Sequence, residues 1–314
     1  MVKIIARIKP YLRWFILGGT LFFLLDTFKK RFAEISHITI DRQGWKVLAI
    51  ALICTLLAHI WSGWVWTRIL NIFGQSLGLF KGIRVYLITN IAKYLPGNVW
   101  HFYGRISALK KQGSSTGTAT LCVLLEPLLM AASALLVAIV STLFGVVDVN
   151  SFLIMLGQIV ALVVVLTGIH PRILNPLLHR LGKSKGNEAT IEARLKTYPL
   201  LPFLGEMGFV IFRGTGFLFT VMALQTVTPF QIPVLLSAFS IAWLLGLIVP
   251  GAPGGIGIFE ATAIALLPQH MFPPATVLLA VALYRVISIV AEAIAALGAW
   301  IVEELRKMSE WSKQ

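Results

Sequence analysis

Glycine and proline interrupt a long apolar region near residue 250. The stretch from Ile248 to Glu260 reads Ile-Val-Pro-Gly-Ala-Pro-Gly-Gly-Ile-Gly-Ile-Phe-Glu, and five of the residues from Pro250 to Gly255 are Gly or Pro. A continuous helix tolerates such a run poorly, because proline lacks a backbone N–H and glycine loses much conformational freedom on folding. Within a bilayer an unwound segment has to be buried in protein or line a wet cavity. The break therefore predicts a polar site inside a membrane protein.

A second break of the same kind lies earlier in the chain. The segment from Leu95 to Arg105 reads Leu-Pro-Gly-Asn-Val-Trp-His-Phe-Tyr-Gly-Arg, and basic residues flank it on both sides, which predicts a re-entrant hairpin. Paired breaks in the two halves of a membrane protein are a good pointer to its substrate site. We expect the two breaks to meet near the bilayer midplane and to enclose a hydrophilic chamber. Its ligand would have an apolar body and a polar or anionic head.

Composition supports an all-α polytopic membrane protein. The 314 residues are 57% hydrophobic and 13% charged, with a mean hydropathy of +0.84, whereas a soluble domain carries roughly 25% charged residues. The formal net charge is +14, but Lys and Arg lie mostly between apolar runs. We attribute this charge to positive-inside bias and attraction to anionic lipid heads, and expect no nucleic-acid partner.

The apolar runs predict seven or eight spans in a single transmembrane domain, residues 1–314. Its pseudo-halves, about 46–169 and 200–302, are joined by a basic loop at 170–198 that we place in the cytoplasm, as we do both termini. We therefore expect a multi-pass protein of the cytoplasmic (inner) membrane. Pro96 lies 30 positions before Glu126 and Pro253 lies 32 before Arg285, a spacing that permits a two-repeat architecture. The basic connector at 28–44, on the outer side, fits this topology least.

Charged residues at membrane depth are the candidates for chemistry. Each costs ~2.5–3.5 kcal/mol on insertion scales, so each needs a partner or a function. We favour function for Glu260 and Arg285. For a second group we favour structural ion pairs: Glu206, Arg213 and Glu292. Arg285 and Glu292 are seven residues apart on one helix face, too far for a direct pair, so each needs a partner elsewhere.

Other polar residues near the breaks leave alternatives open. Half-helices starting at Asn98 and Gly255 would expose backbone N–H groups able to bind an anion, although a tight turn between helices is the alternative. Lys93 and Arg105 either add cationic contacts or extend to the interface. His59 is predicted to be a packing residue. Neither a metal motif nor a nucleotide motif is present, so we expect no metal and no cofactor.

Several of these segments together resemble the lysylphosphatidylglycerol synthase membrane-region family. They are Leu95-Pro-Gly followed by aromatic residues and Arg105, Glu126 within an apolar span, Pro253-Gly-Gly-Ile-Gly-Ile-Phe-Glu260, and Tyr284-Arg285. The family includes the flippase half of the multiple peptide resistance factor and related prokaryotic membrane proteins. The resemblance covers nearly the whole chain.

This resemblance implies a two-repeat helical fold that moves lipids with polar heads between leaflets. The residues it places around a lipid-head cavity are Pro96, Gly97, Arg105 and Glu126 on one side and Pro253, Gly254, Gly255, Gly257, Glu260 and Arg285 on the other. Pro127 follows Glu126 where a basic residue is expected, a departure that leaves the pairing of Glu126 open. Because a soluble aminoacyl-transfer half does not follow Val302, we do not expect synthesis of an aminoacylated lipid.

The sequence thus favours a lipid flippase or transporter for a phospholipid, glycolipid or polyprenyl-phosphate-linked head, with membrane lipids as partners. Arg285, Arg105 and the half-helix N-termini would hold an anionic head, while Glu260 and Glu126 would hold amines or pair with the arginines. One alternative is a membrane-embedded transferase, or an accessory subunit of a separately encoded transferase. Another is a small-solute transporter. An oligomer is compatible with each of these functions.

Overall fold

The computed structural model describes residues 26, 29–95, 99–144, 151–176, 194–249 and 253–311. Across these residues the regular secondary structure is helical and no strand is formed, which confirms the predicted all-α class. The helices are α2 (Arg42–Ile72), α3 (Leu79–Asn90), α4 (Trp100–Lys110), α5 (Thr116–Phe144), α6 (Ser151–Ile169), α8 (Leu200–Met222), α9 (Gln231–Ile248), α10 (Ile258–Leu266) and α11 (Pro274–Trp311), with short 3-10 turns η1 (Ile91–Tyr94) and η2 (Pro253–Gly255).

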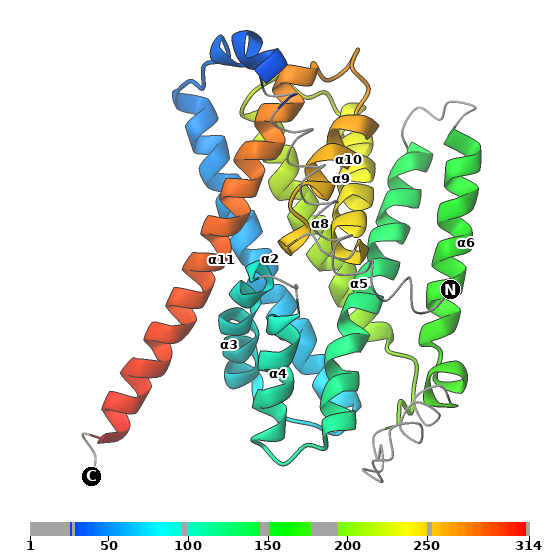
Figure 1. Ribbon diagram of the computed structural model, residues 1–314, viewed down its shortest axis with the longest axis vertical. Coiled ribbons are helices and arrows are strands. Elements are labelled where there is room, and N and C mark those ends of the chain that lie inside the picture. The colour runs from blue at the N-terminus through cyan, green and yellow to red at the C-terminus, as the bar shows by residue number, and fades with distance from the viewer. Residues whose placement is uncertain are drawn as a thin grey trace, which may run out of the picture.

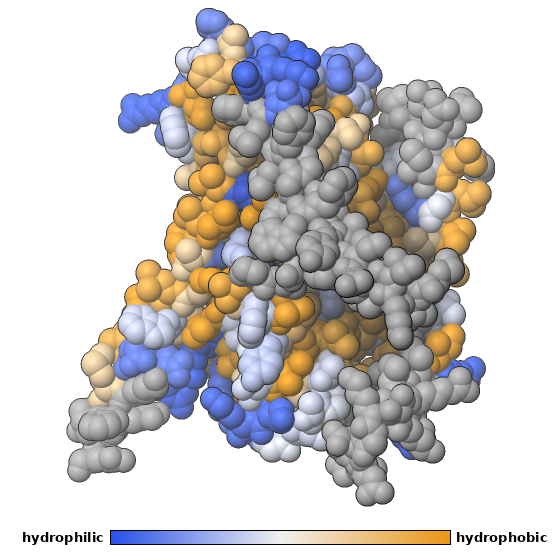
Figure 2. All heavy atoms as spheres, viewed as in Figure 1, coloured by the Kyte–Doolittle hydropathy of each residue, from blue (hydrophilic) through white to orange (hydrophobic). Residues whose placement is uncertain are grey.

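Five of these helices are long and apolar enough to cross a membrane: α2, α5, α8, α9 and α11, while α6 contributes a shorter apolar stretch, Met155–Ile169. Large aliphatic and aromatic side chains are exposed along them, and Figure 2 shows hydrophobic surface over the middle of the molecule with hydrophilic residues at both ends. This is the surface of a multi-pass membrane protein. The predicted first span, residues 14–25, lies outside the described residues, so the total of seven or eight spans stays a prediction.

Two broken hairpins approach each other from opposite ends of the molecule (Figure 1). The helices α2, α5, α6, α8 and α11 run from one end towards the other. The pair α3 and α4 rises from the lower end and turns back near the middle, as the flanking basic residues predict. The pair α9 and α10 descends from the upper end and also turns back near the middle. The η1 and η2 turns of these hairpins are in contact.

Close contact between α2 and α8 forms the spine of the helix bundle. A Cβ on Gly205 would lie 2.7 Å from Val65 Cγ2, and one on Gly216 would lie 2.5 Å from Thr55 Oγ1. These separations are shorter than ordinary van der Waals contacts, so only glycine lets the two backbones approach this closely. The same helices carry His59 and Arg213, which their close packing brings together.

The connector at 28–44 contains a short helix at residues 29–36. Ile35 packs against Ala275 and Leu278 at the start of α11. Asp41 then caps α2, because its side chain accepts a 2.6 Å hydrogen bond from the Gly44 N–H. This cap explains why α2 begins at Arg42, earlier than the predicted residue 46. The connector thus lies at the end of the molecule where α11 begins.

Candidate functional site

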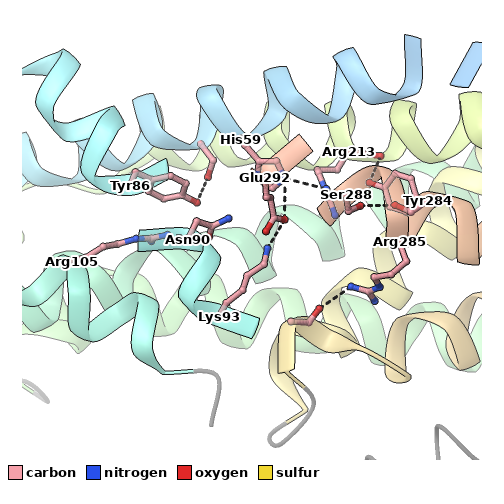
Figure 3. A network of polar contacts seen from close by, with 12 residues as sticks. His59, Tyr86, Asn90, Lys93, Arg105, Arg213, Tyr284, Arg285, Ser288 and Glu292 are labelled. Atoms are coloured by element: carbon pink, nitrogen blue, oxygen red, sulfur yellow. Dashed lines mark hydrogen bonds and ion pairs between the residues drawn. The ribbon is translucent and has the colours of Figure 1, made fainter. Parts of the chain in front are cut away.

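A polar cavity of about 400 Å³ lies between the two breaks. Residues from α2, α3, α4, α5, α8, α9, α10 and α11 line it together with η1 and η2. The ionisable or strongly polar residues among them are His59, Tyr86, Asn90, Lys93, Tyr94, His101, Arg105, Glu126, Arg213, Tyr284, Arg285 and Glu292. Figure 3 shows many of these side chains converging from helices that are far apart in the sequence. The cavity matches the chamber that the two breaks predict.

The tips of the two hairpins form one wall of this cavity. Gly254 has a φ of +58°, and a Cβ there would lie 2.7 Å from Tyr94 Cε1. Gly255 has a φ of +73°, and its Cβ would lie 3.0 Å from the Gly246 backbone of α9. Both the left-handed backbone and the close approach require glycine. The glycines after Pro253 therefore let the second break fit between Tyr94 and α9.

Arg285 and Glu260 hold the second break closed. Arg285 Nε donates to Glu260 Oε1 at 2.6 Å, and Arg285 Nη1 donates to the Gly254 carbonyl at 3.0 Å. The other carboxylate oxygen of Glu260 accepts the Gly257 N–H at 2.6 Å. Arg285 is too far from Glu292 along the helix to pair with it, and Glu260 on another element is its partner.

This geometry corrects the expectation that the half-helix N-terminus after the second break is free to bind an anion. Helix α10 begins at Ile258, and the Glu260 carboxylate already occupies the position in front of its first turn. The physical reason is that a short helix at membrane depth needs its N–H groups satisfied from within the protein. At the first break, α4 begins at Trp100. Asn98, Pro96 and Gly97 lie outside the described residues.

Arg105 and Glu126 form a second buried pair on the opposite side. Arg105 Nη1 donates to Glu126 Oε2, and each residue is 2% exposed. The guanidinium also lies 3.8 Å from the centroid of the Tyr86 ring. The partner of Glu126 therefore comes from α4, which is why Pro127 can replace a neighbouring basic residue. Pro127 itself lies within α5, which continues on both sides.

A third cluster joins four elements through residues that the predicted site omitted. Lys93 Nζ donates to Glu292 Oε1 at 2.6 Å, so Lys93 reaches a buried carboxylate instead of extending to the interface. His59 Nε2 lies 3.1 Å from the same oxygen and 3.3 Å from Arg213 Nη1. His59 is therefore a buried core residue with polar partners, and it forms part of a polar chain. In the sequence, the signal for these residues is a charged or imidazole side chain within an apolar stretch.

Arg213 is held in place without a carboxylate partner. Its guanidinium carbon lies 5.1 Å from the centroid of the Tyr284 ring, and its backbone carbonyl accepts the Tyr284 hydroxyl at 2.9 Å. The residue is 6% exposed, and among the described residues it forms no ion pair with an acid. Its Nε has no hydrogen-bond partner there either.

Glu206, by contrast, lies away from the cavity. It is fully buried in α8, and neither carboxyl oxygen has a hydrogen-bond partner among the described residues. The structural ion pair that the sequence predicts for Glu206 is therefore not formed among the described residues.

Aliphatic side chains surround the mouth of the cavity. Val99, Leu124 and Ile248 all line it, yet they are 55%, 47% and 55% exposed. They belong to the start of α4, the middle of α5 and the end of α9. Exposed aliphatic residues at the middle of a membrane protein contact lipid tails. The cavity thus opens between apolar edges.

A comparison with protein families bears on this arrangement. The model described as "Lysylphosphatidylglycerol synthase TM region" matches residues 12–296. A search of curated proteins gave no match. The matched region includes both breaks and every charged residue of the cavity.

Proposed function

The chain belongs to the lysylphosphatidylglycerol synthase TM-region family, and from this membership we propose that it moves a lipid with a polar or anionic head between the leaflets of the membrane. The observation that carries the proposal is the charged cavity between the two breaks, together with its aliphatic mouth. A closed ion-pair core would hold helices together without a cavity of about 400 Å³. The apolar mouth also favours a lipid over a small solute, which needs no opening towards lipid tails.

In this proposal the site residues have two roles. Arg285 with Glu260, and Arg105 with Glu126, act as paired polar walls that a head group passes between. The glycines of the second break give the head group access to backbone oxygens. Gly254 and Gly255 follow Pro253 directly, and Gly257 follows after Ile256. In the same proposal the protein lies in the cytoplasmic membrane, and the basic excess of the loop at 170–198 supports a cytoplasmic position for that loop.

A lipid-flipping assay tests the proposal. The protein is reconstituted into vesicles containing a fluorescent phospholipid, and dithionite reports how much of it exchanges between leaflets. Replacement of Leu124 at the mouth by Trp adds bulk to an exposed side chain, so folding should persist while exchange falls by about tenfold. Leu128→Trp is the matched control, because Leu128 is 40% exposed one turn along the same helix but does not line the cavity.

Exchange no faster than in empty vesicles, for every lipid tried, would contradict lipid translocation. Equal loss in both tryptophan variants would mean that the mouth is elsewhere. The second candidate is an accessory role beside a separately encoded transferase, which the family description favours because it names a synthase. Co-purification of the intact chain with a lipid-modifying enzyme, and dependence of that enzyme on the chain, would support this role.

A further inference from the structure

Four basic side chains line the cavity, and three of them are neutralised. Lys93 contacts Glu292, Arg105 contacts Glu126, and Arg285 contacts Glu260. Arg213 is the fourth, and no carboxylate pairs with it among the residues that the structure describes. Glu206 does not pair with it either, because neither carboxyl oxygen of Glu206 has a hydrogen-bond partner among the described residues. Among the described residues, Arg213 is therefore the cavity cation that forms no direct ion pair.

The hydrogen bonds of His59 leave N–H groups of the Arg213 guanidinium without an acceptor. His59 Nε2 lies within hydrogen-bond distance of both Glu292 Oε1 and Arg213 Nη1. A carboxylate only accepts, so this nitrogen must carry its proton to bond Glu292, and it then offers no acceptor to Arg213. The guanidinium Nε has no partner either. A buried guanidinium with unsatisfied N–H groups is unfavourable unless a ligand supplies an acceptor.

We infer that Arg213 is the anion-binding group of the cavity and that its ligand is the phosphate group of a lipid head. A phosphate suits this position because its oxygens accept several parallel hydrogen bonds from one guanidinium. Lys93 and His59 lie along the same polar chain, but both contact Glu292, so Arg213 is the group of this chain that is left to bind an anion. The inference rests on the proposed function for its lipid source, and it shifts the anion subsite from the paired Arg105 and Arg285 to Arg213.

Binding of three probes to the full-length protein in a maltoside detergent tests this inference. Dioctanoyl phosphatidic acid has tails and a phosphate, dioctanoylglycerol has only the tails, and inorganic phosphate has only the anion. A ligand that binds the folded state raises the unfolding temperature in proportion to ln(1 + [L]/Kd). We expect a saturable shift with phosphatidic acid, and a much smaller shift with either of the other probes at the same concentration.

Replacing Arg213 should remove this shift. Loss of one partner of a buried charge pair weakens binding by at least about 30-fold, so Arg213→Gln should abolish the effect of phosphatidic acid at concentrations that saturate the wild type. The unfolding temperature without ligand should be unchanged or higher, since an uncompensated charge is removed. Arg172→Gln is the matched control, because Arg172 is exposed outside the cavity and carries the same charge.

Three outcomes overturn the inference. Undiminished binding of phosphatidic acid by Arg213→Gln would show that Arg213 does not bind the anion. Equal shifts with dioctanoylglycerol would show that the tails alone are recognised, and a shift with inorganic phosphate but none with phosphatidic acid would exclude a lipid source. If Arg213→Gln does not fold, Arg213→Met replaces it, because this variant keeps the backbone carbonyl that accepts from Tyr284; binding equal to wild type in folded Arg213→Met contradicts the inference. Arg213→Lys keeps the positive charge and should bind phosphatidic acid better than the neutral variant, so equal binding by the two would also contradict it.

These results are separable from those of the flipping assay. Arg213-dependent binding without any lipid exchange would support the anion subsite and contradict translocation. Exchange that slows in Leu124→Trp, combined with undiminished binding in Arg213→Gln, would support translocation and contradict the anion subsite.

Discussion

At the scale of single residues, the cavity combines buried charges that have partners with groups that lack them. Glu292 accepts from Lys93 and also contacts His59, whereas Arg213 and Glu206 are left without ion pairs. Buried pairs are weak sources of net stability, but breaking one by removing a single partner is costly. The consequences of substitution should therefore differ sharply between the paired residues and the unpaired ones.

Lys93→Met should destabilise the protein by about 3 kcal/mol, because it leaves Glu292 charged and buried with His59 alone. The double variant Lys93→Met/Glu292→Met removes both charges and should recover most of the loss. Thermal unfolding of both single variants and the double variant gives the coupling energy. Lys30→Met is the control, since the Lys30–Asp26 pair is exposed and should contribute almost nothing. Independent effects of the two cavity substitutions would contradict a direct pair.

Glu206→Met should stabilise the protein by about 1–3 kcal/mol, because methionine fills a similar volume without burying two unsatisfied oxygens. Measurement of the unfolding temperature checks this, with Glu34→Met on the surface as the control. A stable variant that no longer moves lipid would assign Glu206 a role in transport, since stability is often lost at functional sites. A large fall in stability would mean that Glu206 has a partner in the folded protein.

Several of these residue-level features could be predicted from the sequence and others could not. A charge inside an apolar span is visible directly, and so is the need of Arg285 and Glu292 for partners elsewhere. The identity of each partner depends on which helices pack together. Arg105 and Glu126 are 21 residues apart, but Lys93 and Glu292 are 199 apart. No spacing rule links such distant positions, so Lys93 and His59 were assigned no place in the site.

At the scale of elements, the second break depends on glycine for both its backbone and its packing. Gly255 has a positive φ and lies against the Gly246 backbone, which cannot move aside as a side chain could. The sequence predicts the break because Pro and Gly cannot continue a helix. It does not predict that Glu260 caps α10, since that depends on the turn of the chain through Gly254 and Gly257.

Gly255→Ala should therefore cost more than an alanine at an unpacked turn. The positive φ alone costs roughly 1–2 kcal/mol, and the approach to 3.0 Å from Gly246 adds overpacking strain of about 1–3 kcal/mol. Gly74→Ala is the matched control, because Gly74 has a similar φ of +67° with no atom within 4 Å of its Cβ. Unfolding temperatures of the two variants separate backbone strain from packing. Equal losses of stability in the two variants would contradict close packing of the second break against Gly246.

At the scale of the whole molecule, the two hairpins enter from opposite ends and meet at a polar centre (Figure 1). The apolar runs and the breaks predict the all-α class and the meeting of the hairpins. Helix ends were placed less well, as α2 extends to Ile72 and α11 to Trp311, beyond the predicted residues 67 and 302. The reason is that polar residues near a helix end can continue the helix beyond the apolar stretch that defines a span.

The arrangement of the hairpins leads to a prediction about orientation in the membrane. The turn at Lys111 follows the first hairpin at one end, and the turn at His270 follows the second hairpin at the other end. Lys and Arg are retained in the cytoplasm near the ends of spans, and the Lys111 end has the basic turn and the loop at 170–198. The opposite end also carries basic residues, in the connector at 29–46, but it is accompanied by the acidic residues Asp26, Glu34 and Asp41.

Single cysteines at these turns decide between the two orientations. With Cys54 and Cys122 replaced by alanine, His270→Cys should react with a membrane-impermeant maleimide in right-side-out vesicles, because that turn faces outwards. Lys111→Cys should react only after the vesicles are opened. Both positions are exposed on the protein, so each should react fully in detergent. Reactivity of Lys111→Cys alone in closed vesicles would invert the topology. Reactivity of both in closed vesicles would contradict hairpins that enter from opposite sides, and with them a cavity enclosed at the centre of the membrane.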